Sequence, residues 1–195
     1  MSSLNHIYQH PHFSPQLLEK IIQAHSKVHI PKGTYLLKSG QLADEYFCVE
    51  IGLIRSYAVD LNGNDITTDF YGINDIAMDV ISLFQRTPAK ENLHALTDCI
   101  CWKINFDDFQ RLFHSVEGFT EWGRAWMTQI LFKSRQRSIS MITETAGDRY
   151  LSLQREHPEI VRQAPLKYIS SYLGITDTSL SRIRNEISKS THSNF

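Results

Sequence analysis

The stretch "PLKYISSYLGITDTSLSRIRNEI", residues 165–187, decides how the whole chain is interpreted, because its helical pattern is interrupted at one glycine. Gly174 permits a sharp turn, and Thr176 just after it is a good N-cap for a second helix. The inward-facing apolar positions are Leu166, Ile169, Tyr172 and Leu173 in the first helix, Ile175 in the turn, and Leu180, Ile183 and Ile187 in the second helix. The pattern therefore predicts two helices joined by a tight turn.

The outer face of the second helix carries short polar side chains around one arginine, where an ordinary solvated helix would carry more Glu and Lys. This face consists of Thr178, Ser181, Arg182 and Asn185, at i, i+3, i+4 and i+7. Short side chains let a helix approach a DNA groove, where Arg can bond guanine and Asn can bond adenine. Ser179 and Arg184 flank the face and are expected to reach phosphates, and residues 162–195 carry a net charge of +3. We predict a DNA-binding helix-turn-helix with Arg182 as the leading base contact.

A β-rich region is expected over residues 27–104, where short alternating segments are separated by turn residues. Its clearest hairpin signal is "LNGN", residues 61–64, because Asn-Gly tolerates the positive φ of tight turns. Several short strands with regular turns are typical of a sandwich or barrel. A helix is predicted before this region, over residues 14–26, with Ser14 as its N-cap and Pro15 at its first position.

The proline-free stretch 117–143 predicts one long helix with two apolar stripes. One stripe consists of Trp122, Trp126 and Ile130, and the other of Met127, Leu131, Ser134, Ser138 and Met141; Lys133, Arg135 and Arg137 are expected on the solvent side. Two stripes exceed what one intramolecular contact requires, so we expect one to pack on the chain's own barrel and the other on a second copy. A further helix is predicted after residue 146, ending before Pro158.

Composition and motif content exclude several functional classes. The chain has 195 residues with a net charge of −1, and it shows neither a membrane-length apolar run nor a secretory leader, so a cytoplasmic protein is expected. Nucleophile elbow, P-loop and dinucleotide motifs are missing, and no enzyme activity, catalytic residue or cofactor is assigned. We interpret the cysteines as small apolar strand residues and the histidines as surface residues rather than metal ligands; these are Cys48, Cys99, Cys101, His6, His10, His12, His25 and His29.

The order of these parts resembles the Crp/Fnr family of bacterial transcription regulators. The segments "IPKGTYLLKSGQ" (30–41) and "YFCVEIGLIRSYAVDLNGND" (46–65) resemble the effector domain of that family. The resemblance implies an α+β fold: a cyclic-nucleotide-binding-like β-barrel (double-stranded β-helix) over 1–116, a dimerisation helix over 117–143 and a helix-turn-helix DNA-binding domain over 144–195. It also implies double-stranded DNA, a second copy of the chain, an unidentified small-molecule effector and RNA polymerase as partners, and no membrane.

One departure from the family pattern affects the effector site. Cyclic-nucleotide-binding members carry a Gly-Glu pair and, further on, an Arg followed by a small hydroxyl residue. By spacing, the residues at these places are Met78, Asp79, Glu91 and Asn92. Met78 blocks close backbone approach and Glu91 repels a phosphate, so we expect a degenerate cyclic-nucleotide site. Arg86 and Lys90 lie nearby and leave another anion open.

A second departure concerns the β-hairpin wing that usually follows the recognition helix in this family. The eight residues after Ile187 show no strand pattern, so a reduced or absent wing is expected. Two other functions stay open at this point. The chain can instead be a regulatory or ligand-sensing barrel protein that does not bind DNA, or, less favoured, a barrel enzyme. Loss of DNA binding on removal of Arg182 distinguishes a regulator from the first, and bound metal and turnover would reveal the second.

Overall fold

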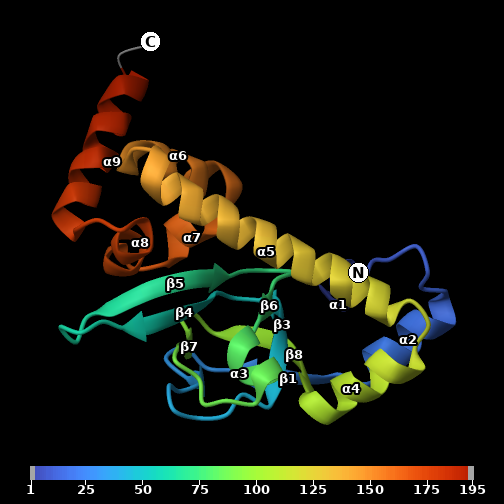
Figure 1. The fold of residues 1–195 in the computed structure, drawn as a ribbon. Coiled ribbons are helices and arrows are strands. Elements are labelled where there is room, and N and C mark those ends of the chain that lie inside the picture. The colour runs from blue at the N-terminus through green and yellow to red at the C-terminus, as the bar shows by residue number, and fades with distance from the viewer. Residues whose placement is uncertain (1–2, 193–195) are drawn as a thin grey trace.

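The computed structural model describes residues 3–192, and the side chains of residues 3–189 (Figure 1). Two short helices, α1 (Ser3–Ile7) and α2 (Pro15–Gln23), precede the β-rich region. The strands are β1 (Ser26–Ile30), β2 (Tyr35–Leu37), β3 (Glu45–Ile51), β4 (Ile54–Val59), β5 (Asp65–Tyr71), β6 (Ile76–Ala77), β7 (Asn92–Ala95) and β8 (Cys99–Asn105), with α3 (Val80–Gln85) between β6 and β7. The remaining helices are α4 (Phe106–Ser115), α5 (Phe119–Thr143), α6 (Ala146–Glu156), α7 (Pro158–Gln163), α8 (Leu166–Leu173) and α9 (Asp177–His192).

The strands form two four-stranded antiparallel sheets rather than one closed barrel. Their orders are β1-β8-β3-β6 and β2-β7-β4-β5, a jelly-roll-like arrangement within the predicted α+β class. The class is confirmed, but closure is not, because strand alternation cannot tell whether sheet edges pair with each other. The predicted Asn-Gly hairpin joins β4 to β5, with Gly63 at a φ of +81°. We call β1–β8 with α3 the β domain.

The first core of the chain joins the N-terminal helices to the β domain and to the start of α5. Ser14 caps α2 as predicted, with its hydroxyl 3.3 Å from the amide nitrogen of Leu17. His25, expected at the surface, is buried instead, because its ring nitrogens find partners in the Tyr8 hydroxyl at 2.9 Å and the Ile21 carbonyl oxygen at 2.8 Å. The three cysteines are buried on β3 and β8, as predicted.

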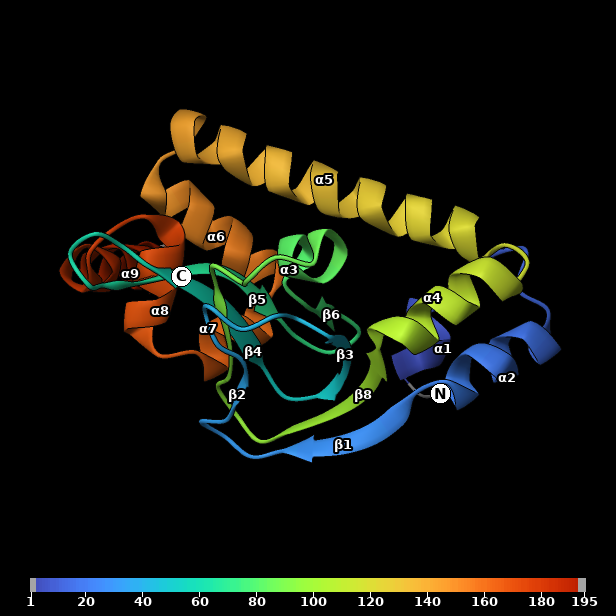
Figure 2. The same ribbon diagram turned by 60° about the horizontal axis from the view of Figure 1, so that its bottom comes forward.

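The C-terminal helical unit, α6–α9, packs against the sheet that contains β4 and β5 (Figures 1 and 2). Three residues of the β domain, Leu53, Phe70 and Leu96, belong to the same buried cluster as the core of this unit. The helical contributors are Tyr150, Leu153, Ile160, Ala164, Ile169, Leu173 and Leu180. The sequence patterns missed α7, a six-residue helix that begins at Pro158 directly after α6.

The long helix α5 is present as predicted, but two of its charged residues lie elsewhere than expected. The charged ends of Lys133 and Arg137 contact other elements of the molecule, although the Lys133 side chain remains 44% exposed. The Lys133 ammonium lies 3.1 Å from an Asp69 carboxylate oxygen on β5, and the Arg137 guanidinium donates to the Tyr172 carbonyl oxygen at 3.0 Å. Helical spacing predicts the stripes of a helix but not the acceptors that a distant strand or helix brings to them.

Among the described helices, none has the length and apolar character needed to cross a bilayer.

Candidate nucleic-acid interface and its attachment to the sheet

The predicted helix-turn-helix corresponds to α8, a short turn and α9. Gly174 ends α8 at a φ of +70°, and the amide of Ile175 donates to the Ser170 carbonyl oxygen at 3.0 Å. Thr176 caps α9 as predicted, accepting from the Ser179 amide at 3.2 Å. A hydrogen bond from the buried Ser170 hydroxyl to the Asp177 carboxylate closes the turn. The angle between the two helices is therefore fixed by contacts from both sides of the turn.

The inner stripe of the unit is largely as predicted. Ile169, Leu173 and Leu180 are buried, while Tyr172, Ile175, Ile183 and Ile187 pack partly buried against the same cluster. Leu166 differs from the prediction, since its side chain is 37% exposed at the start of α8. Its position in the first turn places it beyond the edge of the cluster that the later residues of α8 cover.

The outer face of α9 presents the residues predicted to contact DNA. Thr178, Ser181, Arg182, Arg184 and Asn185 are all exposed. Ser179 is half-buried, and its hydroxyl lies 3.0 Å from that of Thr176, so it takes part in the cap. Nε of Arg182 lies 3.9 Å from a carboxylate oxygen of Glu186, and both side chains are mostly exposed. An ion pair of this kind is weak and leaves the guanidinium able to change partners.

The region after the turn contains helix alone. α9 continues to His192, and residues 174–192 contain no strand. A β-hairpin wing is therefore absent from this described part of the chain, in agreement with the expected reduction.

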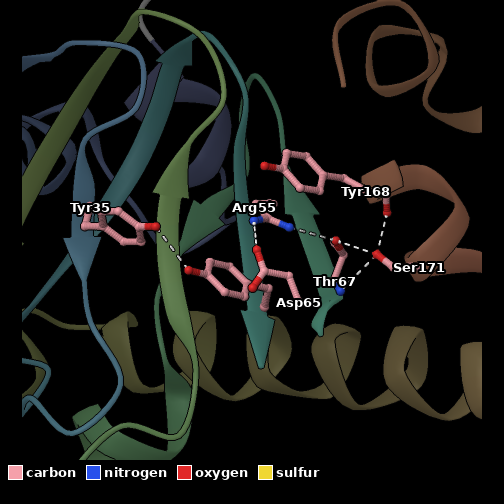
Figure 3. Close-up of polar contacts among 7 residues, drawn as sticks. Tyr35, Arg55, Asp65, Thr67, Tyr168 and Ser171 are labelled. Atoms are coloured by element: carbon pink, nitrogen blue, oxygen red, sulfur yellow. Dashed lines mark hydrogen bonds and ion pairs between the residues drawn. The ribbon is translucent and has the colours of Figure 1, made fainter. Parts of the chain in front are cut away.

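α8 is attached to β5 by a pair of hydroxyl groups. The Ser171 hydroxyl lies 3.0 Å from the Thr67 hydroxyl and 3.2 Å from the Thr67 amide, which donates to it (Figure 3). The ring of Tyr172 meets that of Phe70 edge to face, with centroids 5.3 Å apart. The first helix of the helix-turn-helix thus packs directly on the edge strand of the sheet.

A buried arginine continues this attachment from β4. The Arg55 side chain is only 2% exposed, and its guanidinium lies 3.4 Å from the ring centroid of Tyr168 (Figure 3). It also lies 4.1 Å from the ring centroid of Tyr57. It also pairs with Asp65 at 3.0 Å and donates to the Thr67 hydroxyl at 3.3 Å. Sequence reasoning missed this contact, although an arginine among the apolar residues of a strand was an available signal.

The C-terminal end of α8 is held by two further arginines. Arg137 of α5 donates to the Tyr172 carbonyl oxygen at 3.0 Å, and Arg149 of α6 donates to the Leu173 carbonyl oxygen at 2.9 Å. Cations are favourable at a helix C-terminus, where carbonyl groups lack intrahelical partners. α8 is therefore fixed by the sheet on one side and by α5 and α6 at its end.

The contact between Lys133 and Asp69 links α5 to β5, the strand on which α8 packs. Burial lowers the pKa of the Lys133 ammonium, but the carboxylates of Asp69 and Asp75 outweigh this effect and raise that pKa overall. The lysine is thus held in its charged form. One strand, β5, consequently contacts both the long helix and the first helix of the helix-turn-helix.

The residues at the expected effector site have structural partners. Asp79 is buried and caps α3, accepting from the Ser82 amide at 2.9 Å, and Asn92 accepts from the Ser39 amide at 3.1 Å. Met78 is buried in the first core. Burial raises the pKa of the Glu91 carboxyl, against a hydrogen bond from Thr68 that lowers it.

Arg86, one of the two cations expected near this segment, is engaged elsewhere. Arg86 pairs with Asp44 at 2.7 Å and donates to the Ala43 carbonyl oxygen at 2.9 Å. Within the described residues, no group of three or more His, Cys, Asp or Glu side chains is arranged to hold a metal ion.

The face of α5 that points away from the β domain carries several exposed apolar side chains. In Figure 2 this helix lies along the top of the molecule with no other element beyond it. Its exposed apolar residues include Leu131, Phe132, Ile139 and Ile142, with Phe132 at 66% and Ile142 at 85% exposure. The apolar residues of the predicted second stripe, Met127, Leu131 and Met141, are all exposed, and Phe132, Ile139 and Ile142 extend the exposed apolar surface beyond that stripe.

Comparison with known proteins shows which folds this chain is similar to. Residues 27–116 match the model of the cyclic nucleotide-binding domain. FixK2 from Bradyrhizobium japonicum is 15% identical over 86% of this chain and 86% of its own, with a TM-score of 0.75. CLP, a c-di-GMP responsive global regulator from Xanthomonas campestris, is 14% identical over 91% and 93%, with a TM-score of 0.70. No curated protein matches the chain by sequence.

A third structure extends the likeness over almost the entire chain. The Thermus thermophilus catabolite activator protein is 16% identical over 97% of this chain and 88% of its own, with a TM-score of 0.59. All three matches cover more than four fifths of this chain. Residues 27–116 thus match the cyclic nucleotide-binding domain, and the chain as a whole shares its fold with these three proteins and with a putative transcriptional regulator of the crp/fnr family from Eubacterium rectale.

Proposed function

We propose that the chain is a sequence-specific DNA-binding transcription regulator that acts as a homodimer. The observation that carries the proposal is the exposed outer face of α9, with Arg182 between short polar side chains on a helix that α8 and the turn hold rigidly. A helix that enters the major groove needs a close backbone approach and a bidentate donor at its centre. In this proposal Thr178, Ser181, Arg182 and Asn185 read base edges, and Arg184 contacts a phosphate.

The role of Ser179 is revised within the proposal. Its hydroxyl lies at the Thr176 cap and its amide donates to the Thr176 hydroxyl, so a phosphate contact from this residue would come through a rotated hydroxyl. We keep it among the phosphate-contacting positions, because the N-terminal turn of a helix favours anions.

The homodimer is supported by the exposed apolar face of α5. Leu131, Phe132, Ile139 and Ile142 would be costly to leave in water, and a second copy of the same helix offers a complementary face. Pairing of α5 with itself would relate the two α9 helices by a twofold axis, which predicts an inverted-repeat operator. In this proposal the chain has three functional parts. Residues 1–116 are the effector domain, residues 117–143 the dimerisation helix and residues 144–195 the DNA-binding domain. RNA polymerase is the partner through which such a regulator would act.

The proposal includes an effector domain that does not respond to cyclic nucleotides. Met78 is buried in the core, Asp79 caps a helix and Glu91 presents a carboxyl group where a phosphate would lie. These assignments explain how a cyclic nucleotide-binding domain can persist without its ligand. Calorimetry with cyclic AMP and cyclic GMP tests this part, and micromolar affinity for either would contradict it.

Selection of bound fragments from a random double-stranded DNA pool tests the proposed function. We expect enrichment of an inverted repeat whose half-sites are centred about one helical turn, roughly 34 Å, apart. A protein that uses the domain only to sense a ligand, without binding DNA, would enrich no sequence over the starting pool. Enrichment of a single unpaired half-site would support DNA binding but contradict the dimer.

A further inference from the structure

An apolar cavity of about 250 Å³ lies between the β domain and the first half of α5. Met78, from the segment before α3, and Phe84 of α3 form one wall, Phe109 of α4 forms another, and Trp122 and Trp126 of α5 form the third. The residue at the expected nucleotide site thus faces the dimerisation helix across this cavity. The cavity is distinct from the position that Glu91 and Asn92 occupy, since neither residue lines it.

The polar side chains in the wall already have partners. The Tyr46 hydroxyl lies 2.6 Å from that of Tyr8, and the Trp122 indole nitrogen donates to the Ile7 carbonyl oxygen at 2.9 Å. The Thr120 hydroxyl donates to the Phe113 carbonyl oxygen at 3.5 Å. Arg124, at the edge of the cavity, is exposed to solvent. A ligand inside would meet ring faces and methyl groups, without a hydrogen-bond partner that is free to receive it.

We propose that this cavity binds a small, uncharged, apolar molecule. An engineered cavity of roughly 150 Å³ with apolar walls stays dry and takes up benzene, so by proportion this cavity accommodates about ten carbon atoms. A polar or charged molecule of the same size would lose its hydration without replacement.

The position of the cavity gives the ligand a route to the rest of the molecule, and this step rests on the proposed function. An occupant would touch Met78 and α3 on one side and Trp126 on α5 on the other. α5 in turn contacts β5 and the end of α8 through Lys133 and Arg137. The ligand would therefore act at the start of the same helix whose later residues hold the helix-turn-helix.

1-Bromonaphthalene is a suitable probe because its bromine quenches tryptophan fluorescence on contact. Two of the three tryptophans, Trp122 and Trp126, line the cavity, and the third, Trp102, lies on β8. Gly123 lies in the wall, and a Cβ there would come 3.4 Å from a Phe113 ring carbon, so Gly123→Leu should fill the cavity within an intact helix. Gly147→Leu is the matched control, since Gly147 lies in α6 with only the Thr145 hydroxyl, 3.6 Å away, near its missing Cβ.

We expect saturable quenching in the wild type and in Gly147→Leu, and about tenfold weaker binding in Gly123→Leu because the space is filled. 1-Naphthoate should bind at least about tenfold more weakly than naphthalene in a competition against the probe, because its charge would be buried. Quenching in Gly123→Leu that equals that of the wild type would overturn the proposal. It would also be overturned if the wild type showed no saturable quenching, as expected when a side chain of a second copy fills the space. If Gly123→Leu does not fold, Met127→Phe, at the cavity edge, replaces it. The titration contains no DNA, so its outcome is independent of the proposed function.

Discussion

The guanidinium of Arg55 in β4 lies 3.4 Å from the ring centroid of Tyr168 in α8, so one buried cation joins the sheet to the helix-turn-helix. The two residues are 113 positions apart, and the contact belongs to neither segment alone. A desolvated cation–ring contact is stronger than an exposed one. This pair is therefore a main determinant of how firmly the C-terminal helical unit is attached to the β domain.

The Tyr168 ring can be tested by two substitutions at one position. Tyr168→Leu should lower the free energy of unfolding by about 1–2 kcal/mol, because it removes the ring face while keeping an apolar side chain. Tyr168→Phe retains the ring and should stay close to the wild type. Urea titration followed by circular dichroism measures both. Equal losses in the two variants would show that the hydroxyl, rather than the ring, matters.

The exposed apolar face of α5 predicts the oligomeric state. Phe132→Glu places a charge at the centre of the proposed dimer contact and should shift the protein from dimer to monomer. Leu61→Glu is the control, since Leu61 is fully exposed at the tip of the β4–β5 hairpin, away from α5. Light scattering at micromolar concentration measures the mass. A wild-type monomer, or a dimer that survives Phe132→Glu, would count against pairing through this face.

His25 predicts a specific dependence of stability on pH. Burial lowers the pKa of its imidazole from 6.5 to about 4, against a hydrogen bond with the Ile21 carbonyl oxygen that raises it. The unfolded chain therefore binds a proton between pH 6.5 and 4 that the folded chain does not, so stability is full above pH 6.5 and falls as the pH drops toward 4. The loss should amount to about 3 kcal/mol by pH 4.

Two histidine variants isolate this effect. His25→Gln should lose the stability difference over pH 4–6.5, whereas His29→Gln, at an exposed position of β1, should keep the wild-type dependence. Unfolding free energies from denaturant titrations at four or more pH values, about half a unit to one unit apart, give the comparison. Should His25→Gln retain the same pH dependence as His29→Gln, the buried imidazole is not its source.

Alanine substitutions at two glycines can distinguish the cost of backbone strain from the cost of a steric clash. Gly52, between β3 and β4, has a φ of +104°, and a Cβ there would lie 2.6 Å from the Cys99 sulfur and 2.7 Å from the Asp98 carbonyl oxygen. Gly52→Ala should cost about 3 kcal/mol or more, since strain and overpacking add. Gly63→Ala, at a φ of +81° with open space around it, should cost only about 1–2 kcal/mol. Thermal and urea unfolding measure the difference, and equal losses would contradict the close contact at Gly52.

Local signals in the sequence account for the elements that were predicted, and distant contacts account for those that were not. Ser14, Gly63 and Gly174 each carry a turn or cap preference that acts within a few residues, and the structure confirms all three. The contacts of Lys133 and Arg137 depend on acceptors 64 and 35 residues away. The burial of His25 likewise depends on Tyr8, which only the folded chain brings near it.

For the candidate DNA-binding face, too, local sequence predicted the helix face but not its contacts with distant parts of the chain. Helical spacing placed Thr178, Ser181, Arg182 and Asn185 on one exposed side of α9, which the structure shows. It did not reveal that α8 rests on β5 through Ser171, because Thr67 lies 104 residues earlier in the chain. A helix-turn-helix could therefore be predicted from its own residues, but its attachment to the β domain could not.

The arginines of α9 test whether this face reads DNA sequence. The measurement is the affinity of purified protein for the selected operator and for a scrambled duplex of the same composition, across a salt series. Arg184→Ala should weaken both duplexes alike and reduce the salt slope by about one contact. Arg155→Ala, an exposed arginine of α6 paired with Glu156, is the control and should change neither value.

Arg182→Ala addresses the central claim most directly. The account predicts that this variant loses about 1–3 kcal/mol of operator affinity while its affinity for the scrambled duplex changes little, so that the ratio of the two affinities falls. The loss should be confined to one base pair in each half-site of the operator, where the wild-type preference disappears. An unchanged ratio of operator to scrambled affinity in Arg182→Ala would contradict the assignment of this face of α9 to base reading.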